Sequence, residues 1–571
     1  MGKSEKEKAK RYQLVKLDYF KKADVILTIL KDLDTGRKIM SSMPGPEIEF
    51  HIGKKEHALS TPVHFVKESE TDKIVCPYRK LFLVLAEELV RRGFDESAMD
   101  FYRDCMSSKN FRELSRLGFD PNVHSSDVNV ADYYISRFLR KFPQDPSYSP
   151  TKGFFDIEVD TQGYDRFPNE AEAPCPINAI SYLSVESKRM IVWLLRNPEN
   201  LLCEEFIENV EFHKARLTKA MARVSKKAWM PCLADDIVFN VFDKELEMIE
   251  SFLGFVNNEE RPDFACAWNM KFDILTIVNR LKRLAGEERA ARAVCAADAP
   301  TNDFFYYDDT INQDWADKGD FFQAAGYVNW TDQMLIFAAL RKADGKRESY
   351  ALNAIAQEEL GVGKVEFGEG ETIQNLPYVN YAKFMKYNVI DTYILGLIDA
   401  KNEDIDQMYS LSLMTETRIS KVLKKTVSLR NLLAKFAKEN GLVLSNNRNA
   451  FNKSGKTFRG GFVAEPSLNS ENGMVVSGVS SKFLFENVID MDLASLYPTI
   501  CILFKTDSSN QIGRAILPAE QGSEIPAESG LVDHIVAGDA VHTGKKYFGL
   551  PDADELIRAF EEIAEPEEEK E

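Results

Sequence analysis

The sequence predicts a protein of several domains with α/β and α+β folds, and two observations support this. Residues 151–400 alternate between short β-rich runs and helical patterns, which is typical of an α/β domain. Residues 12–150 mix strand-like alternation with an amphipathic helical pattern at 80–90, which predicts a mixed α+β accessory domain. The length of 571 residues is sufficient for several domains.

Composition and charge exclude several classes of protein. The chain is 44% hydrophobic and 28% charged, and it has no apolar run of the ~18 residues that a membrane helix needs. Residues 1–11 are polar and basic, so we expect a disordered lead-in and no signal peptide. Eight scattered cysteines without a CxxC pair predict a reducing compartment and no zinc site. The net charge of −18 argues against coating of nucleic acid by bulk charge, but it permits a local basic groove.

The strand-like run at 154–159 holds two acidic residues. Asp156 and Glu158 point to one face, and Phe155, Ile157 and Val159 point to the other, because a strand has a period of two. Neighbouring like charges repel and have poor strand propensity, so a cation between them is one explanation. The alternative is an edge strand with a solvated acidic face.

Two later segments each contain an acidic residue on a helix. A short apolar strand at 264–268 leads to Asn269, which is a candidate helix cap, and Asp273 falls in the first helical turn. Tyr387 and Asp391 are four residues apart and share one helical face. Taken singly, Asp273 is more typical of an ordinary first-turn acid, and Tyr387 with Asp391 of an ordinary exposed helix face.

Five other segments complete the pattern. The runs at 177–183 and 189–195 are β-rich, and the acidic, aromatic stretch at 295–331 predicts a hairpin insertion. The segment 211–229 contains six lysines and arginines, which is more typical of a solvated helix face than of a binding surface. Residues 488–498 read as an apolar strand that ends in an acid and turns into a helix.

These motifs, in this order along the chain, resemble the motifs of a known protein family. Asp-x-Glu at 156–158, Asn-x-x-x-Asp at 269–273 and Tyr-x-x-x-Asp at 387–391 resemble the three motifs of proofreading 3′–5′ exonucleases with a DEDD-tyrosine site. Phe-x-Gly-Gly at 458–461 and Asp-Leu-Ala-Ser-Leu-Tyr-Pro at 492–498 resemble the linker and motif A of family B DNA polymerases, most closely those of tailed bacteriophages. The resemblance extends from about 150 to 500.

The resemblance implies an RNase H-like exonuclease domain with a two-metal site. Two Mg²⁺ or Mn²⁺ ions about 3.5–4 Å apart would stabilise the attacking and leaving oxygens of a phosphodiester. The implied ligands are Asp156, Glu158, Asp273 and Asp391. Tyr387 would orient the attacking water with its protonated phenol, and Asn269 is a candidate contact to DNA.

The resemblance also implies the first part of a polymerase palm. Asp492 would bind metal with the Leu493 carbonyl nearby, and the backbone of Ser495, Leu496 and Tyr497 would meet the triphosphate of a dNTP, with the Tyr497 ring excluding a ribose 2′-OH. Candidate DNA contacts in the linker are Phe458, Gly460 and Gly461. The predicted divisions are 1–150 (accessory domain), 151–400 (exonuclease), 401–480 (helical connector and linker) and 481–571 (palm and acidic tail).

The sequence departs from the family in lacking the second palm aspartate of an Asp-Thr-Asp hairpin and the fingers motif Lys-x-x-x-Asn-Ser-x-Tyr-Gly. We therefore expect a split polymerase, in which a second polypeptide supplies the fingers, the remaining palm and the thumb. The alternatives are a truncated chain, a self-sufficient exonuclease and a non-catalytic nucleic-acid-binding scaffold. The expected partners are a DNA primer–template and single-stranded 3′ ends, with a sliding clamp as a further candidate and no membrane. The expected location is the cytoplasm of a bacterial host.

Overall fold

The computed structural model describes residues 11–60, 63–164, 168–345 and 347–446, and the backbone of five short strands beyond them. The chain divides into two compact units, Met1–Ser454 and Gly455–Glu571. Of the second unit the structure describes two antiparallel arrangements: the three strands β17 (Ser467–Asn469), β18 (Gly473–Val476) and β19 (Val479–Ser481), and the pair β20 (Gln511–Ile516) and β21 (Val532–Val536).

The predicted palm and linker residues lie outside the described residues. They are Phe458, Gly460, Gly461, Asp492, Leu493, Ser495, Leu496 and Tyr497. The roles of these residues stay predictions. The domain divisions at residues 150, 400 and 480 also stay predictions. Within the described part of the chain, no helix is long and apolar enough to span a membrane.

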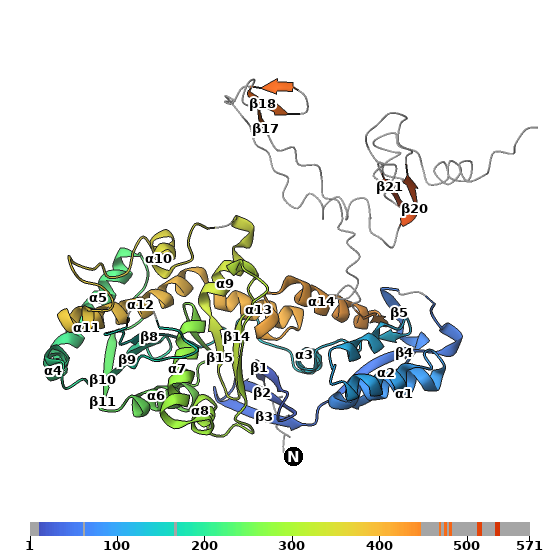
Figure 1. Ribbon diagram of the computed structural model, residues 1–571, viewed down its shortest axis with the longest axis horizontal. Coiled ribbons are helices and arrows are strands. Elements are labelled where there is room, and N and C mark those ends of the chain that lie inside the picture. The colour runs from blue at the N-terminus through green and yellow to red at the C-terminus, as the bar shows by residue number, and fades with distance from the viewer. Residues whose placement is uncertain are drawn as a thin grey trace, which may run out of the picture. The chain divides into compact units, whose positions relative to one another are not determined.

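A mixed sheet of eight strands forms the centre of the first unit (Figure 1), with the order β11-β10-β9-β8-β12-β15-β14-β13. The strands are β8 (Lys152–Val159), β9 (Ile177–Ser184), β10 (Arg189–Leu195), β11 (Asp236–Phe242), β12 (Phe264–Ala267), β13 (Phe304–Tyr307), β14 (Phe321–Ala324) and β15 (Asn329–Asp332). β8, β12 and β15 run parallel, whereas β9 is antiparallel to both β8 and β10. The predicted strands at 177–183 and 189–195 are confirmed, and so is the hairpin insertion, since β13 pairs antiparallel with β14.

Both faces of this sheet are buried. One core contains Phe154 of β8, and the other contains Phe155 and Ile157, so successive side chains of this strand enter opposite cores. Since β8 is the fourth of eight strands, the alternative of an exposed edge strand at 154–159 is wrong.

Helices on each side supply the rest of the two cores. The face of Phe154 is covered by α4 (Leu201–Glu208), α5 (Val210–Lys227), α9 (Gln333–Leu340), α10 (Leu352–Leu360), α11 (Leu376–Val379), α12 (Tyr381–Asn402) and α13 (Asp404–Thr415). The opposite face is covered by α6 (Glu245–Gly254), α7 (Met270–Ala285) and α8 (Glu287–Val294). Figure 1 shows α10 and α12 on one side of the sheet and α6, α7 and α8 on the other. The predicted helices after residue 269 and around residues 387–391 are therefore confirmed.

The N-terminal region has the predicted mixed character. Its first sheet, β1 (Tyr12–Phe20), β2 (Val25–Asp32) and β3 (Lys38–Pro44), adds residues such as Phe20 and Leu27 to the core beneath α6 and α7. A second sheet, β4 (Glu47–Gly53), β6 (Thr71–Pro77) and β7 (Val123–His124), has its own core with α1 (Leu81–Arg92) and α2 (Ala98–Ser107). α3 (Val130–Lys141) packs on β1. The chain later returns here, because β16 (Leu442–Leu444), after α14 (Lys425–Glu439), pairs with β5 (Phe65–Lys67).

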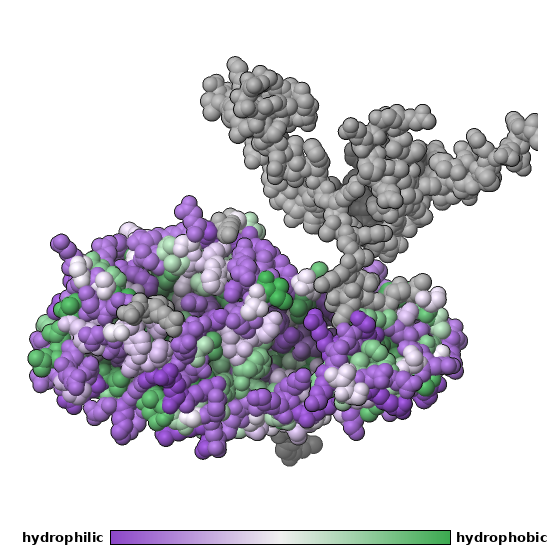
Figure 2. All heavy atoms as spheres, viewed as in Figure 1, coloured by the Kyte–Doolittle hydropathy of each residue, from purple (hydrophilic) through white to green (hydrophobic). Residues whose placement is uncertain are grey.

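The surface seen in Figure 2 is mainly hydrophilic, with hydrophobic residues scattered over it. This is ordinary for a folded protein, because single exposed apolar residues need no special explanation. The apolar residues that matter for the site are therefore those buried against β8.

A close backbone approach at Gly153 gives a test of this packing. An added Cβ at Gly153 would lie 1.8 Å from the Tyr182 hydroxyl oxygen and 2.2 Å from ring carbon Cζ, and Tyr182 is fully buried. We expect Gly153→Ala to lower the free energy of unfolding by about 1–3 kcal/mol, because a buried ring must move. The measurement is chemical denaturation of the full chain.

The matched control is Gly254→Ala at the end of α6. An added Cβ there meets no atom within 4 Å, and the backbone is helical (φ −59°). Alanine should leave stability unchanged or raise it by up to about 1 kcal/mol, because alanine favours helix over glycine. Equal effects of the two substitutions would contradict the packing described for β8.

Candidate active site

The central strand β8 directs two carboxylates toward α12. Asp156 and Glu158 alternate with Phe155 and Ile157, and they lie on the same side of the sheet as Phe154. Glu158 is 9% exposed and Asp156 is partly buried. The sheet thus holds two acidic groups at its centre, where water can solvate them poorly.

Asp273 enters the same region from the adjacent strand. β12 pairs parallel with β8 and leads into α7, whose first turn contains Asp273, a residue only 3% exposed. The turn is sharp because Asn269 has a left-handed backbone (φ 65°). The strand–turn–helix arrangement predicted for residues 264–283 is therefore confirmed.

The prediction that the Asn269 side chain caps α7 is wrong. That side chain makes no capping hydrogen bond; instead Oδ2 of Asp332 accepts one from the Met270 N–H (2.9 Å). Oδ1 of Asp332 accepts from the N–H groups of Met334 (3.0 Å) and Leu335 (3.2 Å) at the start of α9. The parallel strands β12 and β15 end side by side, with Ala267 opposite Asp332, so one carboxylate reaches both helices.

Tyr387 and Asp391 lie one turn apart on α12, beside the strand carboxylates. The Asp391 side chain is 1% exposed, and its Oδ2 accepts a hydrogen bond from Nζ of Lys364 (2.5 Å). The same ammonium contacts the Tyr387 hydroxyl at 3.1 Å and lies over the ring, 5.0 Å from its centroid. Phe367 stacks on the Tyr387 ring at 5.5 Å. These contacts fix both the ring and the hydroxyl of Tyr387.

Lys364 is a site residue that the sequence analysis missed. It lies in the segment between α10 and α12, outside any periodic element. No spacing or motif distinguished it from the 71 other lysines and arginines of the chain. Only the folded structure shows that Lys364 faces Tyr387 and Asp391.

The four carboxylates affect one another electrostatically. Burial raises the pKa of Asp156 to about 7, and the negative charge of Asp391 adds to this effect. Burial and then the charge of Asp156 raise the pKa values of Glu158 and Asp273 well above their usual range. Burial also raises the pKa of Asp391, although Lys364 opposes the shift. The site therefore has an excess of negative charge that one ammonium only partly offsets.

These residues fit divalent cations in chemical type. Hard cations such as Mg²⁺ prefer carboxylate oxygens, and Oδ1 of Asp391 is buried with no hydrogen bond to any described residue. A cation at this position would relieve both the unpaired oxygen and the mutual repulsion of the carboxylates. Among the described residues, however, no group of three or more acidic, histidine or cysteine side chains has metal-binding geometry.

A groove opens beside Asp156, with a cavity volume of about 580 Å³. Two predicted site residues, Asp156 and Asn269, line it together with Lys364. Its lining does not include the other predicted residues of the exonuclease site, which are Glu158, Asp273, Tyr387 and Asp391. Other lining residues supply aromatic rings and a cation: Trp268, Trp315, Tyr350 and Arg347. The Trp315 ring is 40% exposed and can stack on a base. The Arg347 guanidinium already pairs with Glu358 (3.0 Å), and Asp314 and Glu348 also line the groove.

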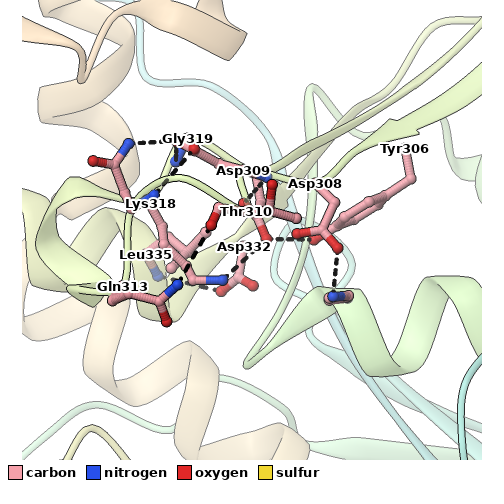
Figure 3. A network of polar contacts seen from close by, with 12 residues as sticks. Tyr306, Asp308, Asp309, Thr310, Gln313, Lys318, Gly319, Asp332 and Leu335 are labelled. Carbon is pink, nitrogen blue, oxygen red and sulfur yellow. Dashed lines mark hydrogen bonds and ion pairs between the residues drawn. The ribbon is translucent and has the colours of Figure 1, made fainter.

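The loop between β13 and β14 forms part of this groove and is held by a polar network (Figure 3). Oδ2 of Asp309 accepts hydrogen bonds from the Gly319 N–H (3.0 Å), Asn312 (2.8 Å) and Lys424 (3.1 Å). Burial alone would raise the pKa of Asp309, but the bonds from Asn312 and Lys424 lower it to about 2. Asp308 pairs with Lys271 of α7 at 2.7 Å, which ties the loop to the helix of Asp273.

The chain is similar to known DNA polymerases. Residues 121–294 match the family model described as DNA polymerase family B, exonuclease domain. The DNA-directed DNA polymerase of Escherichia phage RB69 is 25% identical over 381 residues, which is 65% of this chain and 37% of the phage protein. The DNA-directed DNA polymerase of Enterobacteria phage T4 is 23% identical over 346 residues, which is 60% of this chain and 34% of the relative.

These matches confirm the predicted resemblance to phage family B DNA polymerases. The aligned part covers little more than a third of the length of either relative. The mixed sheet with helices on both faces is consistent with the expected RNase H-like exonuclease fold.

The shared cap on α7 and α9 gives a test of how the site is held. We expect Asp332→Asn to lower the free energy of unfolding by about 1–3 kcal/mol, because the amide group cannot accept from both Met270 and the start of α9. Denaturant unfolding of the full chain measures the change.

The matched control is Asp314→Asn. The exposed Asp314 side chain accepts one hydrogen bond, from the Ala316 N–H (3.0 Å), and an asparagine can accept the same bond. A loss no larger than that of the control would contradict the double cap.

Proposed function

Because the chain contains a family B DNA polymerase exonuclease domain, we propose that it removes nucleotides from the 3′ end of DNA in a metal-dependent reaction. The observation that supports this best is the placement of Asp156 and Glu158 on the central strand beside α12, which carries Asp391, with Asp273 on the helix that follows the neighbouring strand and Asp156 lining the groove. Burial of several carboxylates near one another is costly unless cations neutralise their charge.

The four carboxylates would hold two divalent ions. When bound, such ions supply positive charge for the reacting phosphate and lower the pKa of a water molecule. The chain's own contribution is the orientation of four carboxylates from three elements: the central strand, α7 and α12. The non-catalytic alternative does not explain why these charges are buried together.

Tyr387 has the properties of a positioning group. Burial raises the pKa of its phenol, and so does the charge of Asp391, so the hydroxyl stays protonated near neutral pH. A protonated hydroxyl can orient a water molecule by hydrogen bonding but cannot serve as a general base. Phe367 and Lys364 hold the ring in one orientation.

Lys364 has the properties of a residue that stabilises negative charge. Its ammonium contacts both Tyr387 and Asp391, and their negative and polar atoms raise its pKa against the effect of burial. A permanent positive charge beside the groove would stabilise negative charge that develops on the phosphate. It would also keep Asp391 ionised.

We also propose that polymerisation needs residues absent from the printed sequence. Asp492 resembles one palm ligand, but the sequence contains no Asp-Thr-Asp for the second. A second polypeptide that supplies the remaining palm, fingers and thumb is our leading hypothesis, and a self-sufficient exonuclease is the second candidate. The two differ in whether addition of the second polypeptide allows primer extension.

The central test uses the full chain with Mg²⁺, all four dNTPs and a 5′-labelled primer–template. We expect the primer to shorten without extension, and EDTA to stop the shortening. Removal of Asp156 and Glu158 by alanine substitution should abolish shortening without unfolding the protein. The matched control removes two exposed carboxylates of α8, Glu287→Ala with Glu288→Ala, and should retain activity. Cleavage that persists in the first variant would refute the site assignment.

Lys364 gives an independent test of the mechanism. Lys364→Met keeps the length of the side chain but removes the charge, and we expect the cleavage rate to fall about 100-fold or more. The control is Lys386→Met, an exposed lysine one residue before Tyr387 on the same helix, which should cleave at the original rate. Single-turnover cleavage at saturating Mg²⁺ measures the chemical step. An unchanged rate for Lys364→Met would exclude an electrostatic role.

A further inference from the structure

Helix α5 has a face that the proposed exonuclease site does not use. Five basic side chains on it are exposed and define what we call the basic stripe: Arg216, Lys219, Arg223, Lys226 and Lys227. Their spacing of 3, 7, 10 and 11 residues from the first puts them all on one face of the helix. The stripe is about 16 Å long at 1.5 Å per residue.

The opposite face of α5 is anchored in the core, which fixes the direction of the stripe. Leu217 and Met221 are buried beside α12. The Ser225 hydroxyl bonds to the Tyr393 hydroxyl at 2.7 Å, and Tyr393 belongs to the same helix as Asp391. The basic stripe therefore faces solvent, and rotation of α5 to bury it would disrupt this packing.

The charge of the basic stripe is not balanced locally. The one acidic residue of α5, Glu211, pairs with Lys214 (2.6 Å), which lies off the stripe. Within the described part of the chain, no ion pair or side-chain hydrogen bond involves Lys219, Arg223 or Lys226. A merely solvated helix face usually mixes both signs, as α8 does, where Arg292 pairs with Glu288. A cluster of one sign is unusual in a protein of net charge −18.

Aromatic side chains stand at both ends of the basic stripe. Phe212 is 61% exposed, and the Arg216 guanidinium lies 5.4 Å from its ring centroid. Trp229 is 94% exposed and follows the helix directly, with a left-handed backbone (φ 57°). A single exposed ring would be ordinary, but here two exposed rings adjoin the same row of cations. Rings beside cations are the combination that binds unpaired bases and their phosphates together.

We propose that the basic stripe of α5, with Phe212 and Trp229, binds single-stranded DNA. The cations would contact phosphates and the two rings would stack on unpaired bases. A stripe about 16 Å long can contact a few consecutive phosphates of one strand. No residue of α5 lines the groove beside Asp156, so this is a second contact with DNA. It would hold the strand while its 3′ end is processed elsewhere.

Charge reversal of the stripe tests the electrostatic part. Binding of a 5′-fluorescein-labelled 30-nucleotide poly(dT) to the full chain is followed by anisotropy in EDTA, so that cleavage plays no part. For Lys219→Glu/Arg223→Glu/Lys226→Glu we expect at least about tenfold weaker binding, and a salt dependence reduced by about 2 in log–log slope, at ~0.7 per phosphate. The matched control reverses three exposed lysines of other elements, Lys21→Glu/Lys22→Glu/Lys55→Glu, and should bind like the unmodified chain.

The aromatic part is tested at Trp229. We expect Trp229→Ala to weaken binding at least about fivefold, whereas Trp229→Phe retains most of the affinity because a phenyl ring still stacks. Poly(dT) should quench tryptophan fluorescence in the unmodified chain more than in Trp229→Phe. A duplex of equal length should bind more weakly than the single strand, since its bases are already stacked.

Three results would overturn the proposal. One is equal DNA binding by the stripe variant and by its control. Another is stripe-dependent binding that is as strong for the duplex as for the single strand, which would exclude base stacking. The third is binding of a polyglutamate peptide that is lost on charge reversal of the stripe while DNA binding is unchanged. This result would identify an acidic protein as the partner. Because all measurements lack Mg²⁺, they succeed or fail independently of the exonuclease activity.

Discussion

The burial of β8 on both faces is the constraint on which the site depends. Phe154 enters one core while Phe155 and Ile157 enter the other, so a slip by one residue would move Asp156 and Glu158 into the core beneath α6 and α7. The same alternation fixes Asp156 and Glu158 on the side of α12. Two carboxylates are thereby held in a poorly solvated position by hydrophobic packing that has no chemical role of its own.

The remaining site residues are arranged around this strand by short connections. β12 and β15 run parallel to β8, so the turns that follow β12 and β15 open at the same edge of the sheet. The two helix starts are therefore close to each other. The Asp332 carboxylate accepts hydrogen bonds from the first turns of both α7 and α9. Asp273 is thus held by a cap that comes from a neighbouring strand rather than from its own turn.

Electrostatic balance, rather than packing, distinguishes Lys364 from the basic stripe of α5. Lys364 lies among buried carboxylates, where its charge offsets part of a large local excess of negative charge. The five cations of the basic stripe lie in solvent, and within the described part of the chain Lys219, Arg223 and Lys226 form no ion pair. The first arrangement suits control of charge during a reaction, and the second suits attraction of a polyanion from solution.

The local patterns of the sequence were sufficient for much of the fold and part of the site. The period-two alternation around Asp156 and the four-residue spacing of Tyr387 and Asp391 report backbone geometry, so strand β8 and helix α12 were predictable. The order of three motifs indicated the resemblance to family B DNA polymerases that the comparisons confirm. The hairpin of β13 and β14 also follows from its local pattern.

Tertiary structure alone decided the rest, because it depends on residues far apart in the chain. Asn269 is a residue type that often caps helices. The Asp332 carboxylate, more than sixty residues later, caps α7 instead, because the pairing of parallel strands places it beside the Met270 N–H. No local sequence pattern distinguishes Lys364, because the Asp391 carboxylate lies beside it only after folding. The basic run of α5 was visible in the sequence, but its isolation from acidic neighbours is a property of the folded surface. Sequence therefore determined the elements and their motifs, while long-range packing and charge determined which groups act together.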